Sequence, residues 1–500
     1  MRSRRDQVQA HRFVTRRIVS AMLTGEPERT ELPMRRLAMS VFGSAMVAAI
    51  IFAGVGVYGI LRPGGGRPLD NRLVIERETG ARYVYIEQRL HPVLNYSSAR
   101  LILGAAQPAV QTLSRRSLRN VPRGEPVGIP NAPDALPEPA ALDGLPWTTC
   151  TMRRSPGSVA LATHVLVGSE PAGGVPLEGD ALLVSGGTAP DAIRYLLWNN
   201  RRLKIADGSV LAALDMTAAL PVPVDQALLN SIAAGPDLKP GYVYRAGEPG
   251  ATVDGRVGTI GQVYRSGNQH YLLLDRGLVT IGETMAQLLL RSQQQTPIEI
   301  SAQAAGAVSG NNPRFEAEGF PDDIPRLRNT GTEPAMVCVT YAQGPDGEPS
   351  TSIKLFERAD ERLVAASAEL PPPRVGVDGV RLADRVHLAG GHGALVQVVP
   401  AAGVSATGTT RYLVTDQGVK YALPRQDTDA VQEALGYGGV TPVPVPAYLL
   451  ALLPTGPALD PAAAMRFVPD VEASPPDPAA GGSSGAGGGH GGAGSGTTTK

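Results

Sequence analysis

The stretch LAMSVFGSAMVAAIIFAGVGVYGIL, from Leu37 to Leu61, decides the architecture of this 500-residue chain. Its 25 residues carry no charge, and a helix needs roughly 20 apolar residues to cross a bilayer core about 30 Å thick. Gly54, Gly56 and Gly59 spell GxGxxG, a pattern that binds dinucleotides only between a strand and a helix. Because these glycines lie inside the uncharged run, we interpret them as part of a membrane helix. We expect an uncleaved anchor, because the 36 residues before the run are too many for the leader of a signal peptide.

The residues before this run predict its orientation. Residues 1–36 contain nine arginines, and positive charge flanking a membrane helix marks the cytoplasmic side. We therefore predict a single-pass protein of the cell (inner) membrane with a cytoplasmic N-terminus. The remaining 439 residues would form one extracytoplasmic, or periplasmic, portion.

One face of the membrane helix is a candidate contact surface. Ala45, Ala49 and Ala53 recur every four residues, which places them on the same side of a helix. Small residues at this spacing allow a second helix to approach closely. The alternative is an alanine-rich surface that simply faces lipid.

The cytoplasmic segment has the pattern of an amphipathic helix. Apolar residues repeat on one face, and arginines stand beside them for contact with acidic partners or lipid headgroups. We expect this helix to dock on cytoplasmic partners, and a plain membrane-surface helix is the alternative. The candidate docking residues are Arg12, Val14, Arg16, Arg17, Ile18 and Met22.

The composition limits which functions and which fold classes are possible for the rest of the chain. The net charge is zero, which argues against non-specific nucleic-acid binding by the whole chain. Glycine and proline are abundant and aromatic residues are few, so we expect a loop-rich mixture of short helices and strands outside the membrane. Residues 467–500 are rich in glycine and serine and are expected to be disordered.

The chain has two cysteines, Cys150 in PWTTCTM and Cys338 in AMVCVTY, both in strand-like apolar surroundings. The predicted topology places both outside the cytoplasm, where disulfides form. A bond between them would close a loop of nearly 190 residues, which is worth about 5 kcal/mol at most by chain entropy. Two separate buried thiols are the alternative.

A repeated unit organises the exported portion. Four segments share a tyrosine in an apolar run, a polar turn and a second apolar run, and a short helical pattern follows each. PVPVDQALLNSIAAGPDLKP, from Pro221, also matches PVPVPAYLLALLPTGPALDP, from Pro442, at 10 of 20 positions. We expect the tyrosines to lie in the core of each repeat. They are Tyr83, Tyr195, Tyr271 and Tyr412.

A single hairpin is too small to be stable alone, so we expect the repeats to pack around a β-rich central domain, two at each end. The predicted fold is α+β, with one transmembrane helix and an elongated extracytoplasmic region of four small β-hairpin/helix repeats. The expected ranges are 1–36 for the amphipathic helix, 37–61 for the span, 62–144, 187–245, 265–328 and 404–466 for the repeats, 145–186, 246–264 and 329–403 for the central domain, and 467–500 for the tail.

No catalytic set emerges from the motifs. His387 and His392 stand in HLAGGHG near Asp384, but the loop lacks a third ligand at a fixed spacing, so we expect no metal site. The chain has no GxxxxGK[ST] phosphate loop. We therefore predict no cofactor and no catalytic residue.

The order of these segments resembles a known family. QVQAHRFVTRRIVSAMLTGEPE precedes the span, and ETGARYVYIEQRLHPVLNYSSARLILG, GIPNAPDALP, a tryptophan–cysteine segment and PVPVDQALLNSIAAGPDL follow it. This series is similar to EccB, a membrane component of the actinobacterial type VII (ESX) secretion system, over roughly residues 6–465. The resemblance implies four repeat domains around a central domain that contains a disulfide, at positions matching Cys150 and Cys338.

The resemblance also implies partners and an activity. EccB proteins assemble with the EccC ATPase, EccD and EccE into a hexameric membrane complex, with the mycosin protease at its periplasmic face. We expect a structural subunit that anchors and links the periplasmic face of this pore. One alternative is a nucleotide hydrolase, because some members of the family are described as ATPases. A second alternative is an anchored protein that binds the cell wall, since the repeats are similar to the wall-binding modules of phage lysins.

Overall fold

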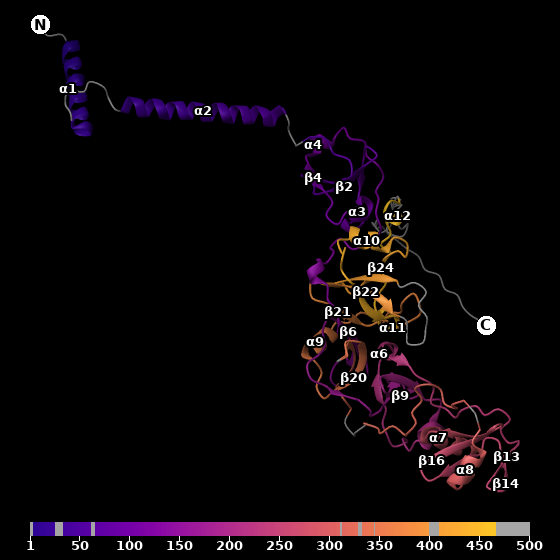
Figure 1. The fold of residues 1–500 in the computed structure, drawn as a ribbon. Coiled ribbons are helices and arrows are strands. Elements are labelled where there is room, and N and C mark those ends of the chain that lie inside the picture. Colours follow the sequence, from indigo (N-terminus) through magenta and orange to yellow (C-terminus); the bar gives the residue numbers. More distant parts are fainter. Residues whose placement is uncertain are drawn as a thin grey trace, which may run out of the picture.

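The computed structural model describes residues 4–25, 34–61, 66–310, 313–328, 333–344, 346–399 and 410–466. The expected disordered tail, 467–500, lies outside these ranges. Two helices come first, α1 (Arg4–Thr24) and α2 (Met34–Leu61). Within the described residues, α2 is the one helix long and apolar enough to cross a membrane, over Leu37–Tyr58. The chain is thus an α+β protein with one apolar helix and a large β-rich region (Figure 1).

Four small sheets of the β-rich region share one topology. Three consecutive strands pair in antiparallel order, a helix follows, and a fourth strand returns parallel to the first. A further short helix follows the fourth strand. We call each such unit a module and number the modules in chain order.

Modules one and two have these elements. Module one contains β1 (Arg72–Glu76), β2 (Arg82–Ile86), β3 (Arg89–Pro92), α3 (Tyr96–Leu103), β4 (Val110–Leu113) and α4 (Arg115–Leu118). Module two contains β8 (Leu182–Gly186), β9 (Arg194–Trp198), β10 (Arg201–Lys204), α5 (Gly208–Ala213), β11 (Val222–Val224), α6 (Gln226–Asn230) and β12 (Ala233–Ala234), which pairs with β10.

Modules three and four follow the same order. Module three contains β15 (Val263–Ser266), β16 (Gln269–Leu274), β17 (Gly277–Ile281), α7 (Glu283–Gln293), β18 (Ile298–Glu299) and α8 (Ala302–Val308). Module four contains β22 (Gly393–Val399), β23 (Arg411–Thr415), β24 (Lys420–Ala422), α10 (Thr428–Ala434), β25 (Val443–Pro446), α11 (Ala447–Leu450) and α12 (Pro461–Ala464).

The central sheet is assembled from the stretches between the modules. Its order is β21-β6-β5-β19-β20-β7. One helix, α9 (Glu361–Ser367), packs on it through the buried Leu363. The strands are β5 (Trp147–Arg153), β6 (Leu161–Val167), β7 (Val175–Pro176), β19 (Met336–Gln343), β20 (Pro349–Phe356) and β21 (Arg385–His387).

The strand pairing corrects the expected boundaries of the central domain. The ranges 145–186, 246–264 and 329–403 include β8, the first half of β15, and β22, and each of these is the first strand of a module sheet. In each module the first strand pairs with one edge of the tyrosine hairpin. Without it, that edge of the hairpin would have no hydrogen-bond partner. The segment 246–264 also holds β13 (Pro249–Val253) and β14 (Arg256–Thr259), whose Val253 packs on Leu273 of module three.

The repeat tyrosines are half-buried, so the expectation that they form the module cores is only partly right. Tyr83, Tyr195, Tyr271 and Tyr412 are all of intermediate exposure. Because side chains alternate across a strand, the next residue in each motif faces the other side and is completely buried. These core residues are Val84, Leu196, Leu272 and Leu413, each 0% exposed.

The shared apolar cores set the order of the units. One core joins modules two and three, through residues such as Leu196 and Leu288, and another joins modules one and four, through Leu101 and Leu413. The central sheet contacts module four through Trp147, and module two through a separate cluster. The β-rich region is therefore elongated, with module one at one end and module three at the other (Figure 1).

Candidate assembly surfaces and buried polar sites

The membrane helix presents its whole circumference to the surroundings. Every described side chain of α2 from Leu37 to Tyr58 is exposed within the chain. Ala45, Ala49 and Ala53 are among them, and successive members of this set are rotated by about 40° around the helix. A partner helix could therefore approach this strip without displacing a large side chain.

The first helix also carries an unpartnered apolar face. Val14 and Ile18 are each 53% exposed and Met22 is 84% exposed. Arg12, Arg16 and Arg17 lie on the same helix, so α1 combines an apolar surface with positive charge. Such a surface suits a membrane interface or an acidic partner. The contact roles of these α1 residues and of the alanine strip remain predictions.

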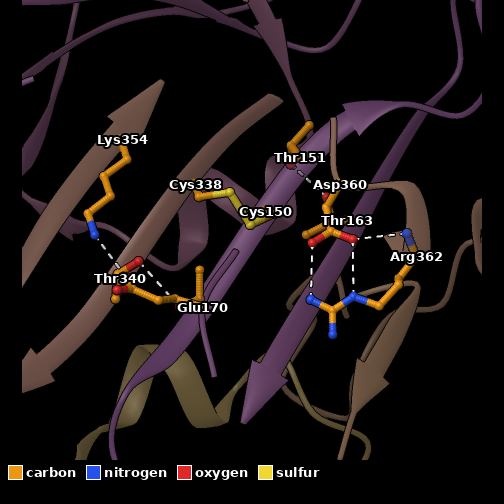
Figure 2. Close-up of a disulfide and its surroundings, with 10 residues drawn as sticks. Cys150, Thr151, Thr163, Glu170, Cys338, Thr340, Lys354, Asp360 and Arg362 are labelled. Carbon is orange, nitrogen blue, oxygen red and sulfur yellow. Dashed lines mark hydrogen bonds and ion pairs between the residues drawn. A yellow bond between two sulfur atoms is a disulfide. The ribbon is translucent and has the colours of Figure 1, made fainter. Parts of the chain in front are cut away.

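The two cysteines form a disulfide between neighbouring antiparallel strands. Cys150 on β5 lies directly opposite Cys338 on β19, with a Cα–Cα distance of 4.1 Å. Figure 2 shows this bond crossing from one strand to the next inside the central sheet. Both residues are fully buried beside Met152, Met336 and other apolar side chains. The bond ties together two strands of the central sheet that are far apart in sequence.

Polar side chains surround the disulfide in matched pairs. The Thr148 hydroxyl donates to Thr340 at 3.3 Å, next to the disulfide along the same two strands. Lys354 donates to Glu170 at 2.9 Å near the end of the sheet (Figure 2). Asp360 accepts a hydrogen bond from the backbone of Arg362 and so caps α9. The threonine contact satisfies hydroxyls that a buried sheet would otherwise leave unpaired, whereas the other two contacts lie at exposed positions.

The buried His164 and the partly buried His387 form a pair, and His164 connects the sheet to α9. His164 lies opposite Cys150 and is 0% exposed. Its Nε2 is 2.8 Å from the Ser367 hydroxyl, and its Nδ1 is 3.0 Å from Nε2 of His387. Burial lowers the pKa of His164 to about 4, and the neighbouring His387 acts in the same direction.

This cluster contains the residue types of a serine–histidine catalytic pair, but its geometry is that of a structural contact. Ser367 is fully buried and donates its hydroxyl proton to the carbonyl of Leu363 at 2.7 Å. A nucleophile needs access to a substrate, and none is available at a side chain without exposed surface. His392, the other histidine of HLAGGHG, instead contacts Asp143 at 3.0 Å. Among the described residues, no three His, Cys, Asp or Glu side chains are arranged to hold a metal.

A second buried polar cluster joins the central sheet to module two. Arg381 donates to Asp384 at 2.8 Å and lies 3.7 Å from Asp225, which caps α6. Asp384 also accepts the backbone N–H of Thr163, and the backbone of Ala383 bonds to Leu452 of module four. Burial raises the pKa of Asp225. The motifs did not predict this cluster, because Asp225 lies far in sequence from Arg381 and Asp384.

A polar hollow lies in module three. It measures about 950 Å³ and is lined by carboxylates at Glu283, Glu316, Asp322 and Asp323, with the cations Arg265 and Arg314 among them. His270 lines it as well and is 7% exposed. A hollow with this excess of carboxylates suits neutral or cationic polar groups better than anions.

Comparison with known proteins identifies the family. A family model described as "Type VII secretion system ESX-1, transport TM domain B" matches residues 2–470. The chain belongs to the EccB family. Among curated relatives of EccB, the "ESX-3 secretion system ATPase EccB3" of Mycolicibacterium smegmatis is 30% identical, over 91% of this chain and 89% of the relative. The "ESX-5 secretion system ATPase EccB5" of Mycobacterium marinum is 28% identical, over 93% of each chain.

Solved EccB structures have the same fold. The EccB3 dimer from the ESX-3 core complex is 28% identical, with a TM-score of 0.57, and covers 79% of this chain and all of its own. A chain of an intact ESX-5 inner membrane complex has a TM-score of 0.57 over 94% of this chain and 96% of its own, at 24% identity. Both structures come from membrane assemblies of ESX secretion systems.

Proposed function

We propose that this EccB protein is a structural membrane subunit of a type VII secretion system, anchored by α2. The observation that carries this proposal is the match of the EccB family model across residues 2–470, which includes α2 and the whole β-rich region. The architecture agrees with such a role. Among the described residues one apolar helix offers an exposed surface within the membrane, and the β-rich region forms an elongated body joined by shared apolar cores.

In this proposal the N-terminus is cytoplasmic and the β-rich region is extracytoplasmic. The proposed partners are subunits of the EccC, EccD and EccE types, with a mycosin protease at the outer face. The proposed assembly is hexameric, and the dimer formed by EccB3 of ESX-3 is compatible with contacts between copies. The apolar face of α1 would dock on the cytoplasmic subunits, and the alanine strip of α2 would contact a helix in the membrane.

Native electrophoresis of gently solubilised membranes tests this function. The full chain with a C-terminal tag should migrate with other secretion subunits in one large complex. A variant that lacks residues 1–30 should lose the cytoplasmic subunits, and Val14→Ser/Ile18→Ser/Met22→Ser should do the same if the apolar face makes the contact. Arg5→Ser/Gln9→Ser serves as the control for changes elsewhere on α1. Migration of the intact chain alone would contradict the proposal.

A nucleotide hydrolase is the alternative, and the names of the relatives favour it, because they include the word ATPase. Two observations weigh against it. The chain has no GxxxxGK[ST] segment, and the polar hollow of module three is lined by more carboxylates than guanidinium groups, which would repel a triphosphate. Purified full-length protein should therefore release no phosphate above background. Turnover that disappears in Arg265→Ala or Arg314→Ala would establish the alternative.

An anchored wall-binding protein is a second alternative. The polar hollow of module three, with the nearly buried His270, is the feature that favours it. The full chain, solubilised without other secretion subunits, would then sediment with insoluble peptidoglycan, and His270→Ala would reduce this. Sedimentation unchanged by the substitution would mean that the hollow does not bind the wall.

A further inference from the structure

Module one differs from the other three modules in its charge. Between residues 66 and 124 it has ten arginines and four carboxylates. In the ranges 182–245, 263–328 and 393–466, which cover modules two to four, the numbers of basic and acidic residues agree to within one. The excess positive charge of the β-rich region is therefore concentrated in the module that follows the membrane helix.

Much of this charge has no compensating partner. Arg115 and Arg123 pair with the buried Glu76 at 2.9 and 3.8 Å, and Arg82 pairs with Asp134. In the described part of the chain, the other arginines on the free surfaces of module one make no ion pair. They are Arg67, Arg72, Arg77, Arg89, Arg116 and Arg119.

The helix α4 presents part of this charge on a fixed support. Its Leu118 is 0% exposed and packs against Val74, Leu90 and Leu113 of the same module. Arg116 and Arg119 are exposed. The opposite part of module one is occupied, because α3 packs against α10 and α12 and Arg100 donates to the Leu435 carbonyl of module four. Figure 1 shows α4 and β4 at the end of module one that faces away from module four.

Chain length keeps this end of the module close to the membrane. Four residues separate Leu61, the last residue of α2, from Gly66, and five Cα–Cα steps span at most about 18 Å. The chain then runs along the edge strand β4, where the Gln111 side chain donates to the Arg67 carbonyl and accepts from the Leu69 N–H. Leu69 and Val110 at this edge are each 50% exposed.

We propose that the β4–α4 end of module one binds the anionic headgroups of the membrane leaflet from which the chain emerges. Exposed arginines beside exposed aliphatic side chains are typical of surfaces that rest in a headgroup region. The short connection to α2 holds this end beside the bilayer whichever side of the membrane it occupies. The contact would fix the tilt of the β-rich region relative to the membrane, which goes beyond the role of a tethered subunit.

Energy transfer between the protein and labelled lipids in nanodiscs tests this proposal. Asn120→Cys places a fluorophore next to α4, and the two native cysteines do not react because they form the disulfide. The full chain is placed in nanodiscs of phosphatidylglycerol or of phosphatidylcholine, each with a small amount of headgroup-labelled acceptor lipid. We expect transfer to be at least twofold higher in the anionic nanodiscs. The excess should vanish between about 0.1 M and 1 M salt, because the Debye length falls from about 10 Å to 3 Å.

Matched charge reversals distinguish a lipid contact from a general charge effect. Arg116→Glu/Arg119→Glu should remove the excess transfer. Arg256→Glu/Arg276→Glu makes the same charge change at exposed positions of the distal end and should leave it unchanged. Equal transfer in both lipids, or no effect of the first pair, would overturn the proposal. A photo-crosslinker at Arg116 that captures a protein subunit in the native complex instead of lipid would also overturn it.

Discussion

Single residues of the central sheet act through contacts between stretches that are far apart in sequence. Cys150 and Cys338 are separated by 188 positions and lie opposite each other on β5 and β19. Their bond restricts the unfolded chain between them, and by chain entropy such a loop contributes up to about 5 kcal/mol. Their context of short apolar strands could be read from the sequence, but the pairing of β5 with β19 depends on the tertiary fold.

Removal of the disulfide should destabilise the central sheet. Cys150→Ala/Cys338→Ala should lower the free energy of unfolding by about 2–5 kcal/mol, because the unfolded chain regains the freedom that the loop removed. Thermal unfolding of the full chain, followed by near-ultraviolet circular dichroism, measures this. Reduction should lower the Tm of the native chain and leave that of the variant unchanged. Equal Tm values for the native chain and the variant under oxidising conditions would contradict this role.

His164 should make the stability of the central sheet depend on pH. Its pKa falls from 6.5 to about 4 on folding because the imidazole is buried. The unfolded chain therefore binds a proton below pH 6.5 that the folded chain does not bind until near pH 4. Stability should be complete above pH 6.5 and fall by roughly 3 kcal/mol as the pH drops to 4.

Urea unfolding at pH 7, 5.5 and 4.5 measures this dependence. His164→Gln should make the loss of stability with acid smaller, because the titrating group is gone. If the free energy of unfolding fell equally with pH in the native chain and in His164→Gln, His164 would not be the source of the pH dependence.

At the scale of elements, the turn of the β23–β24 hairpin couples module four to the central sheet. Gly418 in this turn has φ +70°, and an added Cβ would lie 2.6 Å from Cβ of Val386 on β21. Gly439 in the same module has φ +77° and nothing within 4 Å of an added Cβ. An alanine at Gly439 would therefore test only the strain of the positive φ. An alanine at Gly418 would test that strain together with the steric clash against Val386.

Alanine at these two positions should have unequal effects. Gly439→Ala should cost about 1 kcal/mol, because alanine is strained at positive φ. Gly418→Ala should cost 1–3 kcal/mol more, because its methyl group would press on β21. Urea unfolding of the full-length variants measures both values. Equal losses of unfolding free energy in the two variants would mean that module four does not pack on the central sheet at this turn.

The alanine strip of α2 should matter for association in the membrane. Ala49→Leu would push a partner helix away, so the amount of co-purified secretion subunit should fall several-fold. Val47→Phe adds bulk about 160° around the helix from Ala49 and should have little effect. Equal recovery of the complex from Ala49→Leu and from the native chain would show that the strip faces lipid.

The elements show which parts of this fold can be predicted from sequence. The membrane helix was predictable because 25 uncharged residues need no tertiary information. The tyrosine hairpins were predictable from their alternating apolar runs and from turn glycines such as Gly418. The sequence does not predict that β8 and β22 belong to the modules, because an apolar run such as LLVSG does not encode which sheet it joins. The contact between His164 and Ser367 spans 203 positions and has no local signature.

The β-rich region is a row of units whose excess positive charge lies in module one. Modules one and four form one end of the β-rich region and modules two and three the other, with the central sheet between them (Figure 1). The unit nearest the membrane helix is basic, and the other modules are close to neutral. A long rigid body held at one end by a helix, and steadied there by charge, can bring its distal modules to a fixed place above the membrane.

The central claim is that α2 separates a short cytoplasmic helix from a large structural region outside the cytoplasm. Protease treatment of intact spheroplasts that produce the full chain with different tags at its two ends tests this claim most directly. We predict that the C-terminal tag and the β-rich region are digested, while the N-terminal tag survives on a small membrane-bound fragment. Survival of the C-terminal tag until the membrane is broken would contradict the account.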